Sequence, residues 1–276
     1  MKIALAMTGA LVVWGHVTAR AATEVEPLRL SWTNNMLRVS GEQVTGGSFE
    51  VWYLEAFCRS GSTHRRWEET VIPHRTELLE ATPRELRLKT LVEPSVEILH
   101  HVRATVDEVV FELELVNRGE RFVDVQWFQP CIRVDRFTGR TQADYHERCF
   151  IFTESGRKRL DETERREEAI YRGGQVYVPE AVDLADVNPR PISPERPVNG
   201  LIGCVSADGK QLLATAWSDT QELFQGVIVC IHNDPRVGGL APGETKRLTG
   251  RLYVLANDTD LLLRRYREDF GEEPAK

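Results

Sequence analysis

The chain has 276 residues, of which 41% are hydrophobic, and its formal net charge is -7. This composition is typical of a globular protein that buries a substantial core, and it excludes a disordered chain. The negative charge, without any dense stripe of lysine and arginine, argues against nucleic acid as a partner, because such a surface repels phosphate backbones.

Residues 1–21 have the pattern of a secretory signal peptide. Lys2 precedes an apolar run over 3–13, and Ala19 and Ala21 place small residues where a signal peptidase reads. A buried N-terminal helix is the alternative. The run is shorter than the roughly 20 apolar residues of a spanning helix, and no second apolar stretch of that length follows. We therefore expect an exported protein, periplasmic or secreted, with no membrane span after signal removal.

Five cysteines are present, an odd number, and none shows C-x-x-C spacing. Four of them lie in apolar, strand-like runs. Buried unpaired cysteine behaves as a small hydrophobe, which is the interpretation we prefer. One structural disulfide is the alternative.

Alternation with a period of two dominates the chain. Phe111, Leu113 and Leu115 alternate with Glu112 and Glu114, as in a strand with one wet face. Turn residues over 117–120 predict a hairpin to the next strand, and those over 207–210 predict another. Further strands are expected over 28–32, 36–39, 49–57, 86–90, 96–104, 123–127, 200–206, 212–217, 223–231 and 248–255. The pattern predicts an all-β protein, a large antiparallel β-sandwich that forms one domain over 22–276.

Three segments depart from this pattern. Residues 154–172 are dense in charge and are expected to form a solvated excursion, with a short exposed helix as the alternative. Residues 178–199 contain five prolines and are interpreted as an ordered loop that wraps the sheet. A short C-terminal helix is expected over 259–271, because Asp258 or Thr259 can cap it and Leu262, Tyr266 and Phe270 recur on one face.

The common catalytic and metal-binding motifs are absent from the sequence. It contains no phosphate-binding glycine loop, no G-x-S-x-G stretch and no H-E-x-x-H stretch. His100 and His101 are adjacent, so on a strand they point to opposite faces and cannot hold one ion together. We expect neither a metal nor a cofactor.

Two stretches in the first half of the chain hold one candidate catalytic group, His64, and several candidate substrate-binding groups. His64, Arg65 and Trp67 lie on an expected loop, where binding residues concentrate, although a solvated loop with one packed tryptophan accounts for them equally. Arg133 and Asp135 share a face at strand spacing. The arginine fork suits a carboxylate of an acidic sugar, and a cross-strand ion pair is the alternative.

Two later stretches hold the candidate catalytic groups Tyr145, Glu222 and His232, and the other polar residues of the second stretch are candidate substrate-binding groups. Tyr145 precedes a strand beside a histidine, and such a pair can share proton transfer or only bond locally. The second stretch carries a run of amide, acidic and basic side chains beside glycines. It forms a plausible polar rim for a sugar, with an ordered turn as the alternative. Its members are Glu222, Gln225, His232, Asn233, Asp234 and Arg236.

The stretch over 238–245, Gly-Gly-Leu-Ala-Pro-Gly-Glu-Thr, followed by a strand and a helix, resembles the end of galactose-mutarotase-like supersandwich domains. The resemblance extends to the many-stranded layout of most of the mature chain. It implies a supersandwich fold and a protein that acts on or binds carbohydrate. The H-x-[YF]-F-N-type stretch of the sugar epimerases is absent, so simple aldose mutarotation is not expected.

Two functions remain open at this point. The first is an exported carbohydrate-active protein that acts on or binds a polysaccharide, neutral or acidic. A lyase would use Arg65, Arg133 or Arg236 to neutralise a uronate, and a histidine or tyrosine, His64, His232 or Tyr145, to remove the proton. A hydrolase would instead pair Glu222 or Asp135 with a histidine. The second is a non-catalytic envelope protein that binds a glycan or another protein.

Overall fold

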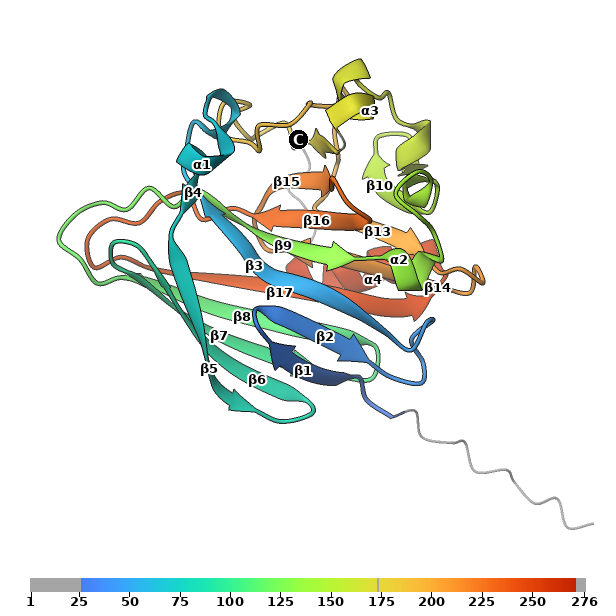
Figure 1. Cartoon of the computed structure of the whole chain (residues 1–276). Coiled ribbons are helices and arrows are strands. Elements are labelled where there is room, and N and C mark those ends of the chain that lie inside the picture. Colours follow the sequence, from blue (N-terminus) through green and yellow to red (C-terminus); the bar gives the residue numbers. More distant parts are fainter. Residues whose placement is uncertain (1–25, 173, 272–276) are drawn as a thin grey trace, which may run out of the picture.

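A computed structural model describes residues 26–172 and 174–271. The predicted signal peptide over 1–21 lies outside these residues. Two antiparallel sheets, of eight and nine strands, form a sandwich (Figure 1). The predicted fold class, a large antiparallel β-sandwich with a short C-terminal helix, is confirmed.

The eight-stranded sheet is called sheet A. Its strands are β1 (Arg29–Thr33), β2 (Met36–Ser40), β3 (Ser48–Cys58), β4 (Val71–Ile72), β9 (Trp127–Arg133), β12 (Gln175–Tyr177), β15 (Thr220–Gln225) and β16 (Cys230–Pro235). Their order is β1-β2-β3-β9-β16-β15-β12, and β4 pairs with the end of β3.

The nine-stranded sheet is called sheet B. Its strands are β5 (His74–Ala81), β6 (Glu85–Val92), β7 (Val96–Ala104), β8 (Glu108–Asn117), β10 (Cys149–Thr153), β11 (Gly156–Arg159), β13 (Ile202–Val205), β14 (Gln211–Trp217) and β17 (Thr245–Ala256). Their order is β11-β10-β13-β14-β17-β8-β7-β6-β5. The hairpin predicted around 207–210 joins β13 to β14.

Alternate residues of the two sheets meet in one core. Leu113 and Leu115 of β8 point into it, whereas Glu112 on the same strand is exposed. Phe128 of β9 enters from sheet A, and its ring lies edge-on to that of Trp217 from β14 at 5.3 Å. Removing one such side chain from water contributes about 1.5–3 kcal/mol, so the interface between the sheets supplies most of the stabilisation.

One polar link crosses this apolar core. His100 of β7 is almost fully buried, and its Nδ1 lies 3.0 Å from the Tyr53 hydroxyl of β3. Its Nε2 lies 3.0 Å from the hydroxyl of Thr90 in β6. A neutral imidazole is a hydrogen-bond donor at one nitrogen and an acceptor at the other. The neutral ring of His100 is therefore satisfied when the Tyr53 hydroxyl donates to Nδ1 and Nε2 donates to the Thr90 hydroxyl.

Strand β3 contains a bulge opposite a proline. Residues 53–55 lie opposite the single residue Pro130 of β9. Because proline has no N–H to donate to the ladder, it is tolerated inside a sheet at a bulge of this kind. Leu54, in the middle of the bulge, is fully buried and has a φ of 67°, a left-handed conformation that is uncommon for a bulky residue.

Two predicted strands are wrong in their boundaries. Residues 123–126 form no ladder, since Val123 makes only an isolated bridge with Leu240, and the next strand, β9, belongs to sheet A. The hairpin predicted around 117–120 is therefore absent, and β8 pairs with β17 and β7 instead. The amide of Asn117 donates to the carbonyls of Arg121 and Leu240. These bonds hold the chain where it crosses between the sheets.

The strand predicted over 223–231 is in fact the hairpin of β15 and β16. Gly226 sits at its turn, where its N–H donates to the carbonyl of Cys230 at 3.0 Å. A Cβ at this position would lie 2.1 Å from the Cys230 sulfur, so a larger residue there would force the Cys230 side chain to move. The apolar residues that follow Gly226 form the turn and do not continue the strand.

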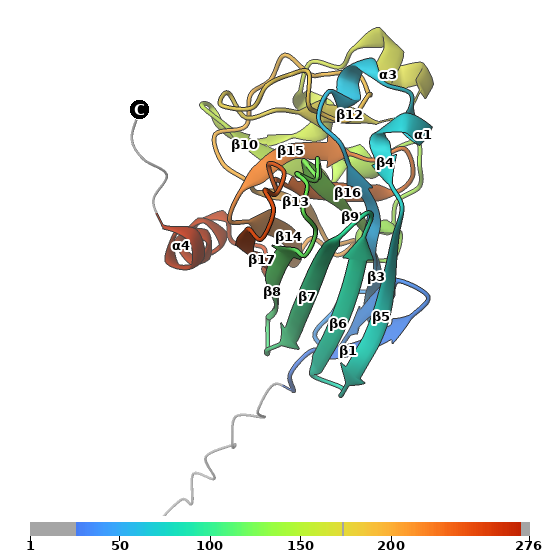
Figure 2. The same ribbon diagram turned by 90° about the vertical axis from the view of Figure 1, so that its left-hand side faces the viewer.

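The short helices lie outside the sandwich, except that the C-terminal one covers part of sheet B (Figure 2). They are α1 (Trp67–Thr70), α2 (Asp135–Thr138), α3 (Glu167–Arg172) and α4 (Thr259–Phe270). The Asp258 carboxylate accepts from the N–H of Leu261 at 3.0 Å and caps α4. Leu262 and Tyr266 pack on the outer face of sheet B, as their spacing predicts. No helix among the described residues is long and apolar enough to span a bilayer.

All five cysteines lie within the described residues, where they are buried and unpaired. This agrees with the preferred interpretation of their apolar surroundings. Cys149 and Cys204 stand directly opposite each other on β10 and β13, with their side chains in the main core.

Candidate functional site

The outer face of sheet A, turned away from sheet B, gathers five of the twelve residues that the sequence singles out as candidates. Along β16, Cys230, His232 and Asp234 point outward, while the residues between them point toward sheet B. Residues directly opposite on paired strands share a face. Glu222 of β15 is opposite Asp234, and Arg133 of β9 is opposite Cys230, so both join this row.

His232, Asp234 and Glu222 form an enclosed acidic cluster. All three are buried, and Nδ1 of His232 lies 3.5 Å from a carboxylate oxygen of Asp234. The other oxygen of Asp234 lies 3.4 Å from the amide nitrogen of Gln129 in β9. One oxygen of Glu222 accepts from the N–H of Asn188 at 2.9 Å. The other oxygen of Glu222 has no hydrogen bond within the described residues.

Burial sets the protonation of this cluster. It raises the pKa of Glu222 well above its usual value, and the neighbouring Asp234 adds to the effect. It also raises the pKa of Asp234, against the opposing influence of His232. Desolvation lowers the pKa of His232, but Cys131 and Asp234 outweigh it and raise the pKa above its usual value. The cluster therefore holds a carboxyl group that retains its proton more readily than usual, next to a charged imidazole.

The role of Cys131 in this balance is limited. A hydrogen bond with Cys230, together with burial, raises the pKa of the Cys131 thiol. A thiol that keeps its proton attracts no imidazolium. Asp234 is therefore the group that favours the charged form of His232.

Two loops form a roof over the cluster, at the top of Figure 1. The proline-rich loop over 178–199 supplies Asn188 to Glu222 and packs three valines against Phe224 of β15. The loop over 59–66 binds it, because the N–H of Thr63 donates to the carbonyl of Ala185 at 3.1 Å and the N–H of Gly61 donates to Asp186 at 2.7 Å. The roof separates the acidic cluster from solvent.

An open cleft of about 470 Å³ lies on the same face, at the end of β9. Its lining residues are Met36, Glu50, Arg133, Asp135, Gln142, Ile228 and Val229. Arg133 and Asp135 do not share a strand as predicted, because β9 ends at Arg133 and Asp135 begins α2. They face the same cleft nevertheless.

Arg133 is the distinctive group of this cleft. Within the described part of the chain its guanidinium has no ion-pair partner, and its buried Nε has no hydrogen bond. Glu50, which stands opposite it on β3, lies instead 3.6 Å from Arg38. Arg133 is thus a partly buried cation whose fork remains available to an anion entering the cleft.

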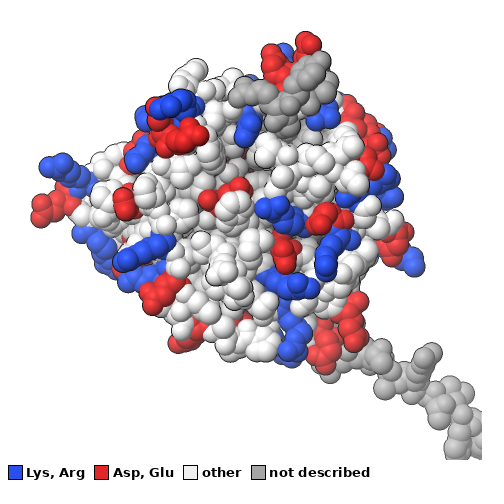
Figure 3. Space-filling model, in the orientation of Figure 1, with Lys and Arg blue, Asp and Glu red and all other residues white. Residues whose placement is uncertain are grey.

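Trp52 stands next to this cleft. It is 36% exposed and lies directly opposite Met36, a lining residue, on the paired strands β2 and β3. An exposed indole offers an apolar face with a polar N–H at its edge. Figure 3 shows the side of the molecule that carries sheet A, where acidic and basic side chains alternate without a large area of one sign.

Three further predicted residues lie near the roofed cluster but do not join it. The Tyr145 hydroxyl donates to the carbonyl of Gly226 at 2.6 Å, and burial raises its pKa well above the usual value. Gln225 is buried and alternates with the outward residues of β15. Asn233 faces sheet B, where its amide donates to the carbonyl of Gly200 and to the hydroxyl of Thr220.

The remaining predicted residues lie at the rim or away from the face. His64 and Arg65 are exposed on the roof loop over 59–66. Trp67 packs on a small apolar cluster that contains Trp127. This agrees with the alternative interpretation of the stretch as a solvated loop with one packed tryptophan. Arg236 follows β16, and its positive charge opposes the burial that raises the pKa of Asp219. It is not among the residues that line the cleft.

Several site residues were not selected from the sequence. Glu50 and Gln142 line the cleft, and Cys131 lies in the row beside His232. Alternation along the strand over 49–57 could have placed Glu50 and Trp52 on one face. No local pattern indicates Gln142 or Cys131, because both reach the site only through the pairing of distant segments.

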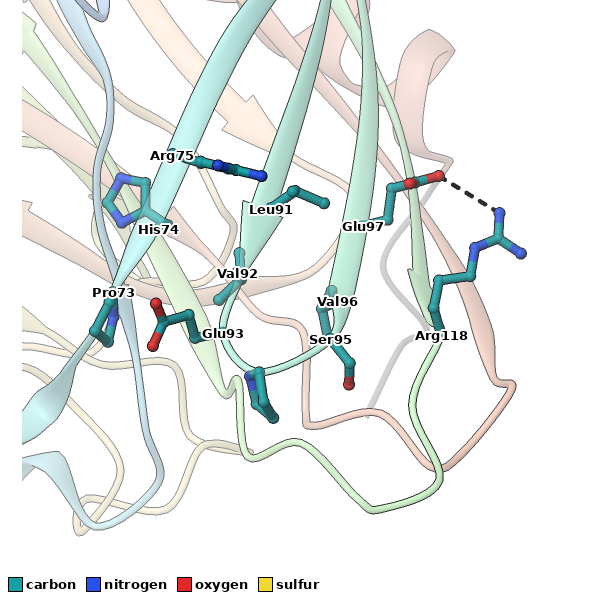
Figure 4. Close-up of a pocket in the computed structure, with 11 residues that line it drawn as sticks. Pro73, His74, Arg75, Leu91, Val92, Glu93, Ser95, Val96, Glu97 and Arg118 are labelled. Carbon is teal, nitrogen blue, oxygen red and sulfur yellow. Dashed lines mark ion pairs between the residues drawn. The ribbon is translucent and has the colours of Figure 1, made fainter.

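A second cleft, of about 550 Å³, lies at the edge of sheet B where β5, β6 and β7 meet (Figure 4). Its Glu97 is paired with Arg118 at 3.5 Å and with Lys89 at 2.6 Å. Its His74 ring lies 3.0 Å from the Leu54 carbonyl. Glu97, Arg118 and His74 already have partners inside the protein, and the other charged groups of this cleft, Arg75 and Glu93, are exposed. The cleft on sheet A, where the charged Arg133 is partly buried, is therefore the better candidate for a ligand.

The chain matches no model of a protein family, and no curated protein is significantly similar to it in sequence. Solved structures are similar to it in fold. A protein from Synechocystis sp. PCC 6803 is 9% identical, with a TM-score of 0.46 over 87% of this chain and 99% of the other. A galactose mutarotase related enzyme from Lactobacillus acidophilus is 10% identical, with a TM-score of 0.44 over 84% and 98%.

A galactose 1-epimerase from Lactobacillus acidophilus NCFM is 9% identical, with a TM-score of 0.41 over 84% of this chain and 99% of the other. At these values the likeness is one of strand layout and says nothing about activity.

Proposed function

We propose that the protein is an exported carbohydrate-binding protein whose ligand is a polysaccharide or oligosaccharide that contains uronate. The observation that carries this proposal is the guanidinium of Arg133, which has no ion-pair partner among the described residues and lies in a cleft of about 470 Å³. A carboxylate of the sugar would accept two parallel hydrogen bonds from that fork.

The surroundings of Arg133 suit the rest of a sugar ring. Trp52 offers a stacking surface at the border of the cleft, and Met36 extends it. Glu50, Asp135 and Gln142 supply acceptors and one amide donor for hydroxyl groups. Apolar surface combined with a few placed polar groups is the usual composition of a small-ligand site.

Binding is favoured over catalysis because the strongest acid-base candidates are enclosed. Glu222, His232 and Asp234 lie under the roof loops with 2% or less of their surface exposed. Catalysis of the lyase or hydrolase type is the second candidate, and the observation in its favour is the raised pKa of two adjacent carboxyl groups, a feature that accompanies active sites. It requires the roof to admit a substrate.

One experiment separates the two candidates. The purified mature chain is passed over immobilised neutral and uronate-containing polysaccharides, and the eluates are analysed by mass spectrometry and ultraviolet absorbance. We expect retention on a uronate polymer without new chain ends. Arg133→Ala should abolish retention, whereas Arg136→Ala, which removes a nearby exposed charge of α2, should preserve it.

The other outcomes have definite meanings. Unsaturated or saturated fragments would establish a lyase or a hydrolase and replace the binding proposal. Equal retention of the Arg133→Ala and parent proteins would refute the role of this cleft.

Export is part of the same proposal and rests on the sequence of residues 1–21. Expression of the full chain in a bacterium, followed by N-terminal sequencing of the periplasmic fraction, tests it. A mature protein that begins at Ala22 supports export. An uncleaved chain confined to the cytoplasm contradicts it.

A further inference from the structure

Three soft or borderline metal-binding groups meet on the outer face of sheet A, beneath the roof. The sulfur atoms of Cys131 and Cys230 and a ring nitrogen of His232 all lie within 4.8 Å of one another. The Cys230 sulfur is 3.2 Å from Nε2 of His232. All three side chains are nearly fully buried.

Strand pairing produces this arrangement. Cys230 and His232 are two residues apart on β16, so they point to the same face. Cys131 of the neighbouring strand β9 comes two residues before Arg133, the partner of Cys230, and so shares that face. No short sequence motif is involved, which is why the spacing of the cysteines does not indicate a metal.

The separations suit a tetrahedral cation. With Zn–S bonds of about 2.3 Å and Zn–N bonds of about 2.0–2.1 Å, ligand atoms of a tetrahedral site lie about 3.5–3.8 Å apart. The observed limit of 4.8 Å and the 3.2 Å contact bracket these values. Small rotations of the cysteine side chains would bring all three atoms to one ion.

The second nitrogen of the histidine is supported as metal-bound imidazoles usually are. Nδ1 of His232 lies 3.5 Å from Asp234, a distance from which a hydrogen bond forms with little movement. Gln129 in turn holds the other carboxylate oxygen at 3.4 Å. A carboxylate that orients an imidazole toward a metal is a recurrent feature of zinc sites.

Unsatisfied polar atoms lie around the imidazole of His232, on the side away from the two sulfur atoms. Nδ1 of His232 and Oδ1 of Asp234 have no hydrogen bond within the described residues, and neither has Oε1 of Glu222, although all are buried. Such groups are costly inside a protein unless they are paired or help to hold an ion. A cation at the three ligands would draw the imidazole into position and place positive charge among these carboxyl groups.

We propose that Cys131, Cys230 and His232 bind one thiophilic d10 cation, with Zn²⁺ as the first candidate and Cu(I) as the second. Asp234 acts as a positioning residue through the imidazole. Three protein ligands leave one coordination position for water or for a side chain of the roof. The metal site shares no ligand residue with the cleft around Arg133. The test of metal binding is therefore independent of the carbohydrate proposal.

The test uses the full mature chain, purified anaerobically under reducing conditions and stripped with a chelator. Zn²⁺ and Cu(I) are offered separately, and bound metal is counted per chain. We expect one ion per chain and a rise of several degrees in Tm. X-ray absorption of the Zn²⁺ form should show two sulfur neighbours at about 2.3 Å and nitrogen at about 2.0 Å. Competition between the two ions ranks their affinities for the site.

Variants assign the ligands. Cys131→Ser, Cys230→Ser and His232→Gln should each lose the ion, while Cys204→Ser, a buried cysteine of sheet B, should retain it as a matched control. Asp234→Asn should weaken affinity about 10- to 100-fold without changing the sulfur neighbours seen by X-ray absorption.

The absorption measurement on the unmutated chain decides the matter if the variants fail to fold. An oxygen-only shell or fewer than two sulfur neighbours would overturn the proposal. Failure of the reduced protein to take up either ion would also overturn it. The same holds if the native protein contains a Cys131–Cys230 disulfide and still binds no metal once that disulfide is reduced.

Discussion

The buried imidazole of His100 should make the fold sensitive to acid. Its ring bridges Tyr53 and Thr90 inside the core, and burial lowers its pKa from 6.5 to about 3. The folded protein therefore keeps His100 neutral over a pH range in which the unfolded chain binds a proton. Stability must fall as pH drops below about 6.5, because protons then favour the unfolded state.

The size of the effect follows from the two pKa values. Each unit of difference corresponds to about 1.36 kcal/mol. Between pH 7.5 and pH 5 the unfolded chain gains about 2 kcal/mol from this single protonation, and the full difference, on the order of 5 kcal/mol, is reached near pH 3. The loss occurs wholly between the two pKa values, as pH falls from about 6.5 to about 3.

Denaturant unfolding of the parent and of His100→Gln at several pH values between 7.5 and 5 measures this contribution. Glutamine removes the titration, so the other ionisable groups cancel in the comparison. We expect the variant to be less stable at pH 7.5 because it loses the bridge across the core. The gap in unfolding free energy should then narrow by about 2 kcal/mol at pH 5. A gap that stays constant with pH would refute the assignment of a neutral buried imidazole.

Three further substitutions test other parts of the structure. Arg133→Lys keeps the charge but loses the planar fork, so affinity for a uronate polymer should fall about tenfold in a retention or calorimetric assay, and an unchanged affinity would exclude bidentate binding. Phe128→Ala should lower the unfolding free energy by about 3–5 kcal/mol, whereas Phe122→Ala, at a 61% exposed ring, should change it by less than about 0.5 kcal/mol. Asp258→Ala should cost about 1 kcal/mol through loss of the α4 cap, and Asp258→Asn should restore most of it; equal losses would show that the cap contributes nothing.

Much of the sandwich follows from alternation alone. The strands around Leu113, Val39 and Leu88 each bury alternate residues, so their faces can be assigned from the sequence. The edge strand β5 cannot be assigned in this way, because most of its residues are exposed and it has no clear apolar face. Residues 123–126 mislead for the opposite reason: Val123 and Val125 are buried in a loop that crosses between the sheets.

The site is less predictable than the fold because it is made by pairing between distant strands. Glu222 and His232 lie in one hairpin, and both could be selected from their local chemistry. Their enclosure by the loop over 178–199 and the approach of Cys131 depend on tertiary contacts that leave no local pattern. Asn233 is a residue that the local sequence wrongly suggests for the site. Its neighbours predict a binding rim, but the alternation of the strand turns its side chain toward sheet B.

The bulge in β3 has a consequence for insertions and deletions in this chain. Residues 53–55 face one residue of β9, so the bulge contains two more residues than a regular ladder needs. Deleting two residues there would keep Trp52 and the distal half of β3 on their present faces. Deleting one would turn every later side chain of the strand to the opposite face. Length variants of this segment should therefore survive in steps of two residues, and single-residue changes should be lost to misfolding.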